Sequence, residues 1–276
     1  MITAPKDCVL IGLDLSQAET WIVATLADER TMKDALLHSD IHIVTASALF
    51  LPNSNCSHEW SKVKGGGYCR ICKANISPDE RYLGKKNNHA NSYRQSPPQL
   101  VRSVNGESDQ PPYLTITLKQ AVSYNKAWHG LYFGIKGWWR KIESDLGPER
   151  TLTTPYGRKR TFYDFWGESL FREATAYVPQ STVGDHALGA VQDELGITGG
   201  ILGISKIPEV IKYCKIINSA HDSVLIECPI TALDDIANKA YNQFHRPLIV
   251  NGESVTIPVD IEYGPRWGEL EKYTIK

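Results

Sequence analysis

The sequence predicts a mixed α/β (α+β) fold with an antiparallel sheet, a helical central region and a small zinc-ribbon-like insertion. The apolar run at residues 8–13 is typical of a buried strand. Residues 215–227 fit two strands joined by a tight turn. Between these stretches, apolar residues recur mostly at helical spacing. With 276 residues, 42% of them hydrophobic, the chain is long enough for one or two domains.

Two aspartates stand out because each adjoins an apolar strand. Asp14 comes at the end of the first strand, where desolvation disfavours a lone carboxylate unless a cation meets it. Asp222 lies, with His221, at the predicted turn near the other end of the chain. On neighbouring strand ends, the two carboxylates could hold a pair of divalent ions. Each aspartate taken alone is more simply explained as a turn or cap residue.

Composition narrows the expected location and partners. The net charge is -1, so nucleic-acid binding would have to come from local basic clusters. No segment approaches about eighteen apolar residues, and the N-terminus lacks the apolar core of a secretory signal. Six cysteines in a chain of this length do not suggest a disulfide scaffold. We therefore expect a protein of the reducing cytoplasm, with no membrane partner.

Most of the central region is expected to be helical. The patterns predict helices at residues 16–28 and 31–37, and a further helix opened by residues 40–42. Residues 94–112 are rich in Pro, Ser, Gln and Gly and predict a loop. Residues 116–142 fit a long helical stretch with a break near Gly134. Its aromatic residues are expected in the core rather than around a ligand: Tyr124, Trp128, Tyr132, Trp138 and Trp139.

A metal-binding pattern interrupts this region. Cys56 and His58 are followed, after a ten-residue spacer, by Cys69 and Cys72. Two close pairs of such ligands suit a tetrahedral structural Zn²⁺, and the glycines of the spacer give it room to fold back. A loop with incidental cysteines is the alternative. Four protein ligands would leave no open position for a substrate.

The best-marked helix start lies at Ser77, which can cap the helix, with Pro78 in the first turn and Glu80 completing a capping box. The helix carries polar residues at four-residue intervals: Arg81, Lys85, His89 and Tyr93. Each step drifts by about 40°, so these residues form one slowly winding stripe. Such a stripe could present cations to a triphosphate and rings to a base. An ordinary solvated polar face is the alternative.

A second basic stretch lies at residues 154–160, a turn or hairpin with three consecutive cations, Arg158, Lys159 and Arg160. On a loop these cations suit phosphate contacts, and a solvated charge cluster is the alternative. A helix is then expected to begin near Glu168, and residues 251–263 alternate well enough for strands.

Six motifs follow one another along the chain: residues 13–19, Asp40-Ile41-His42 with Thr45-Ala46, Arg81-x3-Lys85-x3-His89-x3-Tyr93, Thr154-x2-Gly157-Arg158-Lys159-Arg160, Arg172-x7-Gln180 and His221-Asp222-Ser223. In this order they resemble the catalytic half of family A (DNA polymerase I-type) DNA polymerases, in phage-like form. The match runs from about residue 8 to the C-terminus. Six motifs in this order would match the family by chance only very rarely.

The resemblance implies a role for each matching residue. Asp14 and Asp222 would be the carboxylate ligands of two Mg²⁺ ions, and the backbone at Leu15 would also face a metal. Glu19 would be the steric gate that excludes a ribose 2′-hydroxyl. The incoming deoxynucleoside triphosphate (dNTP) and the templating base would meet Arg81, Lys85, His89 and Tyr93. Primer-template DNA would be contacted by Arg158, Arg160, Arg172, Gln180 and His221.

The implied activity is template-directed DNA synthesis, in which a primer 3′-hydroxyl attacks the α-phosphate of a dNTP by a two-metal mechanism. The implied organisation is a right-hand palm in two segments, residues 1–30 and 151–276, with helical fingers at residues 31–150. The zinc-binding insertion at residues 53–76 belongs to the fingers. Three residues depart from the family pattern: His89, Arg94 and Ser223, where an aromatic ring, a glycine and an acidic residue are usual.

The family's thumb, first palm strands and exonuclease domain precede the first motif, and this chain starts almost on that motif. We therefore expect the catalytic part of a split or truncated polymerase, active with a second polypeptide that supplies thumb and upstream palm. A non-catalytic DNA-binding remnant or accessory subunit is the alternative. A two-metal nuclease is a further one, against which Glu19, Arg81 and Lys85 argue. A phage origin would place the protein in the cytoplasm of a bacterial host.

Overall fold

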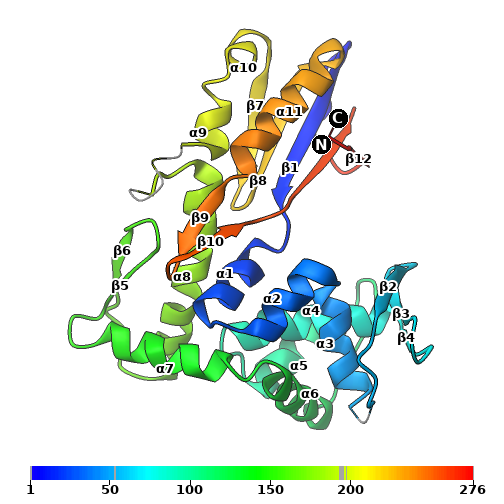
Figure 1. Ribbon diagram of the computed structural model, residues 1–276, viewed down its shortest axis with the longest axis vertical. Helices are drawn as coiled ribbons and strands as arrows, with labels where there is room; N and C mark the ends of the chain where they lie inside the picture. Colours follow the sequence, from blue (N-terminus) through cyan, green and yellow to red (C-terminus); the bar gives the residue numbers. More distant parts are fainter. Residues whose placement is uncertain (1, 53, 193–195, 197, 276) are drawn as a thin grey trace. The chain divides into compact units, whose positions relative to one another are not determined.

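The computed structural model describes residues 2–52, 54–192, 196 and 198–275 (Figure 1). Its helices and antiparallel sheets confirm the predicted mixed α/β fold class. The chain divides into two compact units. The first comprises Met1–Ile22, Leu152–Arg160 and Tyr177–Lys276, and the second Val23–Thr151 and Thr161–Ala176. Among the described residues, no helix is long and apolar enough to cross a membrane.

The first unit is built on a five-stranded antiparallel sheet in the order β12-β11-β1-β8-β7. Its strands are β1 (Cys8–Leu15), β7 (Lys215–Ala220), β8 (Ser223–Pro229), β11 (Val259–Gly264) and β12 (Glu271–Lys272). The apolar run that predicted the first strand takes the central place, and most of its residues are buried. The two strands expected within residues 215–227 are β7 and β8, joined by a tight turn.

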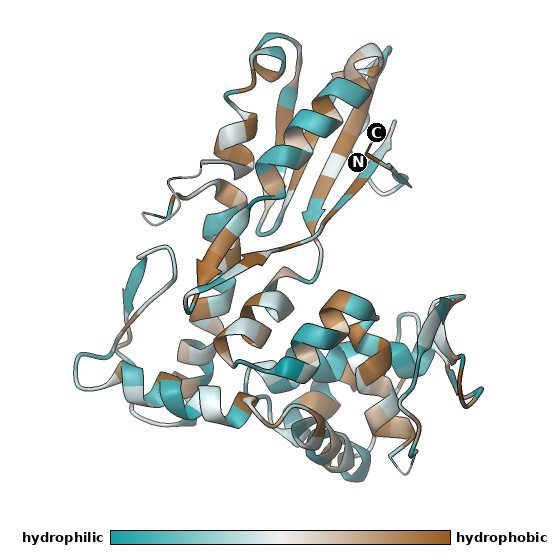
Figure 2. Cartoon of the chain, in the orientation of Figure 1, coloured by the Kyte–Doolittle hydropathy of each residue, from teal (hydrophilic) through white to brown (hydrophobic). Residues whose placement is uncertain are grey.

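Helix α11 (Leu233–Phe244) packs against β1, β8 and β11. Four of its residues are buried at helical spacing: Ile236, Ala237, Ala240 and Phe244. Figure 2 shows β1 mostly in hydrophobic colours and hydrophilic residues on the visible side of α11. The helix thus covers one face of the sheet, and its amphipathic pattern explains why.

The other elements that lie wholly in the C-terminal segment of the first unit are short. They are α9 (Gly200–Ile204), α10 (Pro208–Tyr213), the 3-10 helix η1 (Ile230–Ala232), and the hairpin of β9 (Pro247–Val250) and β10 (Glu253–Thr256). Helices α1 (Ala18–Leu26) and α8 (Glu168–Leu188) each run from one unit into the other, and β5 (Thr151–Thr153) and β6 (Lys159–Thr161) flank the basic turn.

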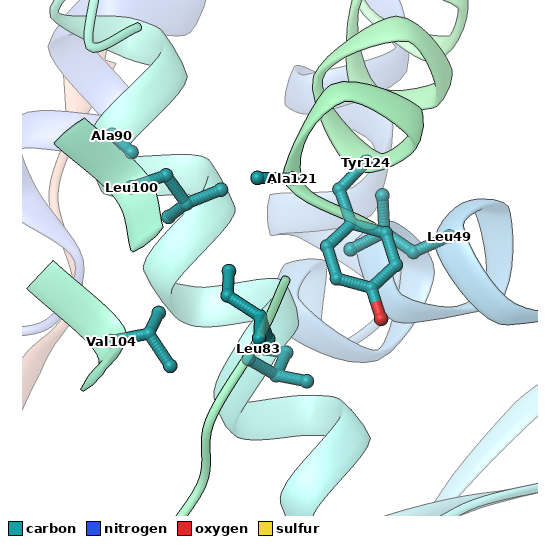
Figure 3. Close-up of a cluster of buried hydrophobic side chains, with 8 residues drawn as sticks. Leu49, Leu83, Ala90, Leu100, Val104, Ala121 and Tyr124 are labelled. Carbon is teal, nitrogen blue, oxygen red and sulfur yellow. The ribbon is translucent and has the colours of Figure 1, made fainter. Parts of the chain in front are cut away.

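The second unit is mainly helical. Its helices are α2 (Arg30–His38), α3 (Ile41–Phe50), α4 (Pro78–Ser92), α5 (Pro97–Asn105), α6 (Leu118–Leu131) and α7 (Ile135–Leu146). A small antiparallel sheet of β2 (Trp60–Val63), β3 (Gly66–Cys69) and β4 (Asn75–Ile76) lies between α3 and α4 in the sequence. Leucines from α3, α4 and α5 meet Tyr124 of α6 in one buried cluster (Figure 3). This cluster holds α4, and with it the polar stripe, in place.

The prediction of a loop at residues 94–112 was wrong, because α5 occupies Pro97–Asn105. Ser96 and Gln99 form a capping box, and Pro97 suits the first helical position because its missing N–H would be unpaired there anyway. Leu100 and Val104 bury the helix in the core. The break expected near Gly134 is present, since α6 ends at Leu131 and α7 begins at Ile135. Four of the five aromatics expected in the core are buried, and Trp139 donates to the Ser92 carbonyl.

Candidate active site

The end of β1 carries the first candidate carboxylate. Asp14 is the next-to-last residue of the strand, and it lies opposite Ser223 of β8 and Asp260 of β11. Leu15 follows it, buried, and its N–H donates to the backbone carbonyl of Asp222 over 3.0 Å. The structure therefore brings Asp14, Leu15 and Asp222 together, although 208 positions separate the two aspartates in the sequence (222 minus 14).

The second carboxylate lies in the two-residue turn between β7 and β8. Its first residue, His221, has a φ of 41°, the left-handed conformation that tight hairpin turns require. The His221 Nε2 atom lies 3.3 Å from the carboxylate of Glu19, in the first turn of α1. The turn thus places Asp222 beside β1 and His221 beside the proposed steric gate.

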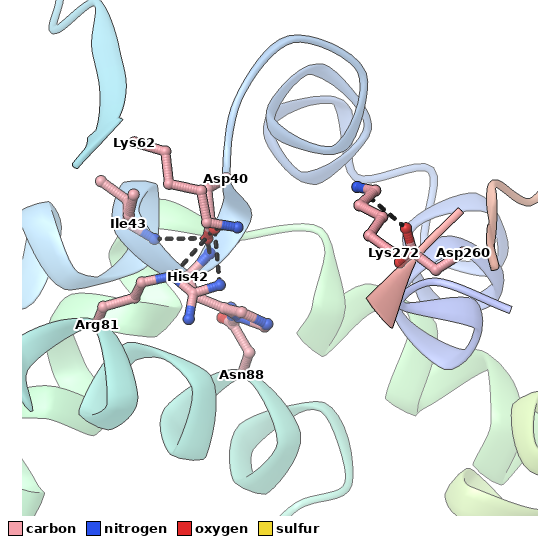
Figure 4. A network of polar contacts seen from close by, with 8 residues as sticks. All are labelled: Asp40, His42, Ile43, Lys62, Arg81, Asn88, Asp260 and Lys272. Atoms are coloured by element: carbon pink, nitrogen blue, oxygen red, sulfur yellow. Dashed lines mark hydrogen bonds and ion pairs between the residues drawn. The ribbon is translucent and has the colours of Figure 1, made fainter. Parts of the chain in front are cut away.

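Two further carboxylates lie on the same face of the sheet, which sequence reasoning missed. Residues directly opposite in adjacent strands share a face, so Asp260 lies beside Asp14, and Glu262 lies beside Gly12. Burial, followed by the charges of Asp222, Asp260 and Glu262, raises the pKa of Asp14 to about 6. Lys272 offsets part of this charge, with its Nζ 3.8 Å from Asp260 (Figure 4).

Asp14, Asp260 and Glu262 line a pocket of about 440 Å³ on this face, and Asp222 is not among its lining residues. Gly12, Asn218, Leu225, Trp267 and Leu270 are also among its lining residues. Gly12 leaves little room to spare, since a Cβ built there would lie 3.2 Å from the Leu270 side chain. Carboxylate oxygens around an open hollow are the donor set that hard divalent cations prefer. Burial, and after it the repulsion between these carboxylates, raises the pKa of Asp14, and a bound divalent cation would offset both effects.

In the second unit, α4 presents the predicted polar stripe. Ser77 caps the helix in the expected capping box with Glu80. Lys85 and His89 are exposed, and Tyr93 is the C-cap residue rather than part of the helix. The rings of His89 and Tyr93 meet edge to face at 5.5 Å. Cation and rings therefore follow one another along one side of α4, as the spacing predicted.

Arg81, the first member of the stripe, is held by Asp40. Its Nε and a terminal nitrogen donate to Asp40 Oδ2 over 3.0 and 2.7 Å, and Lys62 Nζ lies 3.3 Å from the same oxygen (Figure 4). The other oxygen of Asp40 accepts from the N–H groups of His42 and Ile43 and so caps α3. Sequence reasoning placed the start of this helix at residues 40–42, but it did not predict the two cations beside Asp40.

His42 lies buried behind this ion pair. Burial lowers its pKa to about 4; Asp40 opposes the change, and Arg81, Lys85 and Lys62 add to it. The neutral ring accepts at Nδ1 from the Asn88 amide over 3.1 Å. Asn88 Oδ1 in turn accepts from Trp128 and from Thr45 of α3. A buried hydrogen-bond network therefore fixes α3 against α4.

The predicted zinc ligands come together. The ligand atoms of Cys56, His58, Cys69 and Cys72 all lie within 4.8 Å of one another. The Cys56 and Cys69 sulfurs are 3.8 Å apart, and Cys72 Sγ lies 3.4 Å from His58 Nδ1. Although burial raises the pKa of Cys69, hydrogen bonds from the Cys72 and Ile71 backbone and from His58 lower it to about 6. The predicted insertion spans 53–76, and its first residue, Asn53, lies outside the described residues.

The candidate DNA-contacting residues are dispersed. Arg158 donates through Nε to both oxygens of the buried Asp185, over 3.0 and 2.9 Å, so its guanidinium already has a carboxylate partner. Arg160 lies over the Tyr177 ring at 5.6 Å. Arg172 and Gln180 both belong to α8, on parts of the helix that fall in different units.

No protein-family model matches the chain. Over 280 residues it is 24% identical to DNA polymerase I of Helicobacter pylori, covering 98% of this chain and 26% of that protein. DNA polymerase I of a Synechocystis species is 23% identical over 282 residues, covering 96% and 25%. DNA polymerase I of Lactococcus lactis is 22% identical over 269 residues, covering 96% and 27%. The chain thus spans about a quarter of the length of these curated relatives.

The fold is similar to that of the POL domain of Pol1 from M. smegmatis in a complex with DNA primer-template and dNTP. The TM-score is 0.70 at 17% identity, and the match covers 96% of this chain and 41% of that one. Low but consistent similarity to several DNA polymerase I proteins, together with a polymerase-domain fold, confirms the resemblance to family A DNA polymerases. The roles of the individual site residues stay predictions.

Proposed function

We propose that this chain catalyses template-directed DNA synthesis, the transfer of a nucleotide from a dNTP to a primer 3′-hydroxyl by a two-metal mechanism. The observation that carries the proposal is that Asp14 and Asp222 come together at one end of the five-stranded sheet. Leu15, the residue after Asp14, donates its backbone N–H to the backbone carbonyl of Asp222. The relatives named DNA polymerase I supply the reaction class.

Asp14 and Asp222, with the Leu15 backbone, are the groups we propose to hold two Mg²⁺ ions. Bound there, the ions would lower the pKa of the primer hydroxyl and stabilise the charge on the leaving pyrophosphate. Glu19 occupies the space that a ribose 2′-hydroxyl would need and so selects deoxynucleotides. His221, beside Glu19, contacts the primer-template.

On the second unit, Arg81 and Lys85 bind the triphosphate, and His89 and Tyr93 lie near the base. Arg160, Arg172 and Gln180 contact DNA. Because Arg158 is paired with Asp185, we propose that it supports the basic turn and reaches DNA only at its exposed side.

The four ligands of the insertion bind one structural Zn²⁺. Their two-plus-two spacing and their convergence within 4.8 Å support this proposal. Purified protein should contain one equivalent of zinc by metal analysis, and chelation should loosen the β2–β4 module without melting the five-stranded sheet. Zinc-free protein in which the module stays equally protected from hydrogen exchange would contradict the assignment.

We propose further that DNA synthesis requires additional polypeptide bound beside β7. This strand is one of the two edge strands of the described sheet. In α10, which precedes it in the sequence, Ile211 is 70% exposed and Tyr213 is 48% exposed. Open strand edges and exposed apolar side chains both favour association. Addition of a thumb and upstream palm fragment from a relative should therefore stimulate primer extension, whereas equal extension without it would contradict this requirement.

The test of the main proposal is primer extension with dNTPs and Mg²⁺, followed on a denaturing gel, with Asp14→Asn and Asp222→Asn as controls. Extension by the wild type that both variants lose would support polymerase activity. Shortening of the primer would point to a two-metal nuclease instead. Tight DNA binding with no extension, even with the added fragment, would favour the accessory-subunit alternative.

A further inference from the structure

Lys62 is a cation that the zinc-binding module brings to the start of α4. It lies on β2, between His58 and Cys69 in the sequence, and its Nζ lies 3.3 Å from Asp40 Oδ2. The Arg81 guanidinium donates to that same oxygen over 2.7 Å (Figure 4). The Lys62 side chain is 64% exposed, whereas that of Asp40 is only 10% exposed. The ammonium group is therefore shared between a buried carboxylate and solvent.

The module that carries Lys62 is packed firmly onto α3. Gly67, opposite Lys62 in the β2–β3 pair, approaches the helix so closely that a Cβ there would lie 2.6 Å from Ile43 Cγ2. Trp60 packs against the buried cluster of Ile43, Ala46 and Ile76. The ring of His58, one of the four candidate zinc ligands, is stacked on Trp60 at 4.8 Å. A continuous set of contacts thus links the zinc ligands to α3.

The same module leads directly into α4. Its last strand, β4, ends at Ile76, and the next residue is the N-cap Ser77. Lys62 and Arg81 are therefore both fixed relative to the zinc ligands, one through β2 and the other through β4 and the cap.

The charges around Asp40 do not cancel. One carboxylate faces Lys62 and Arg81, and Lys85 follows Arg81 one turn later on α4. All three cations act together on the buried His42 and help to keep it neutral. Lys62 and Lys85 are exposed and Arg81 is partly buried, and their excess of positive charge suits a ligand with several negative charges, such as a triphosphate.

We propose that Lys62 is a further triphosphate-binding residue, held beside Arg81 by the zinc-bound module. This inference rests on the proposed polymerase function and adds a residue outside the polymerase motifs. One N–H of the Lys62 ammonium stays on Asp40, while the other two are available to phosphate oxygens. Lys62 also leaves Asp40 with a cationic partner when Arg81 turns toward the nucleotide. Zinc therefore acts on nucleotide affinity without touching the nucleotide.

The first experiment measures binding of a fluorescent dNTP to the full chain at fixed ionic strength with Mg²⁺. Lys62→Ala should raise the dissociation constant about five- to tenfold, because it removes one charge-assisted contact. Lys64→Ala is the matched control, since Lys64 lies in the turn of the same hairpin and should leave the constant unchanged. Arg81→Ala serves as the reference for a damaged triphosphate site. Zinc content and circular dichroism of each variant establish that the module is intact.

The second experiment tests the dependence on zinc. Removal of zinc by a zinc-selective chelator that leaves Mg²⁺ in place should weaken dNTP binding by about the same factor as Lys62→Ala. The same treatment of the Lys62→Ala variant should weaken binding little further. If Arg81→Ala weakens binding but Lys62→Ala and chelation do not, the role of Lys62 is overturned and the proposed function stands. If the zinc-loaded wild type binds no dNTP at all, even with the thumb and upstream palm fragment and primer-template added, the proposed function fails together with this inference.

Discussion

Asp14→Asn should make the metal-free protein more stable at neutral pH while it abolishes DNA synthesis. The pKa of Asp14 is raised from 3.8 to about 6, first by burial and then by Asp222, Asp260 and Glu262. A shift of about two units corresponds to at most about 3 kcal/mol of unfavourable free energy in the ionised form. Because Asp14 is exposed by more than a third and is screened by solvent, we expect about 1 kcal/mol.

The sign of the pH dependence follows from proton linkage. The folded protein binds the Asp14 proton more tightly than the unfolded chain does, so the carboxyl group costs no stability below about pH 4. As the pH rises from about 4 to about 6, the unfolded chain loses this proton first, and the folded state loses stability. An asparagine cannot lose a proton, so the variant lacks this loss. The difference between the two proteins should therefore be near zero at pH 4 and fully developed at pH 7.

The assay is urea unfolding of both proteins in EDTA at pH 4 and pH 7, followed by primer extension with Mg²⁺. Removing a metal ligand that contributes about 4 kcal/mol should lower the extension rate by about three decades. Asp260→Asn is the matched control, because it removes a neighbouring charge without removing a proposed metal ligand. It should stabilise the protein slightly and keep most of the activity. An Asp14→Asn variant that is less stable than the wild type at pH 7, or that keeps more than about a tenth of the rate, would refute the reasoning.

Three other changes give expected outcomes. Glu19→Ala should lower the preference for deoxynucleotides over ribonucleotides at least about tenfold in single-nucleotide incorporation, and an unchanged ratio would remove the steric-gate role. Gly67→Ala should destabilise the second unit by about 1–3 kcal/mol in thermal unfolding, because its Cβ would lie 2.6 Å from Ile43. Gly137→Ala is the control, since a Cβ there meets nothing within 4 Å, and it should stabilise the same unit. The pKa of His42 is lowered to about 4, so the folded state binds its proton less tightly than the unfolded chain does. The free energy of unfolding should therefore fall by at most about 3 kcal/mol as the pH drops from about 6.5 toward 4. Urea unfolding at the two pH values should show a smaller fall for His42→Gln.

Features set by local sequence were the ones that could be predicted. The capping box at Ser77 placed the start of α4, and the Cys and His spacing predicted which four residues would meet. The strand-turn-strand pattern placed Asp222 in a tight turn. Each of these depends on residues a few positions apart, where steric and hydrogen-bonding preferences act directly. The loop predicted at residues 94–112 failed for the same reason, since Pro97 and Pro98 can begin a helix as well as prevent one.

Features that depend on distant pairing could not be predicted. Asp260 lies beside Asp14 only because β11 pairs with β1 in one particular register, and a shift of one residue would have turned it to the other face. Similarly, nothing local indicates that Asp40 accepts from Arg81 or that Asp185 takes the guanidinium of Arg158. Sequence patterns thus show which side chains carry charge, whereas long-range packing decides which charges are already paired.

The surroundings of Asp14 in the first unit are negatively charged, whereas those of Asp40 in the second unit are positively charged. This difference decides which kind of ligand each site favours. In the first unit, three carboxylates surround Asp14 closely enough to raise its pKa, so the site disfavours any further negative group. In the second unit, the two positive charges of Lys62 and Arg81 outweigh the single negative charge of Asp40, so this site favours phosphate. The carboxylates around Asp14 would therefore repel a bare triphosphate, and the cations around Asp40 would attract one.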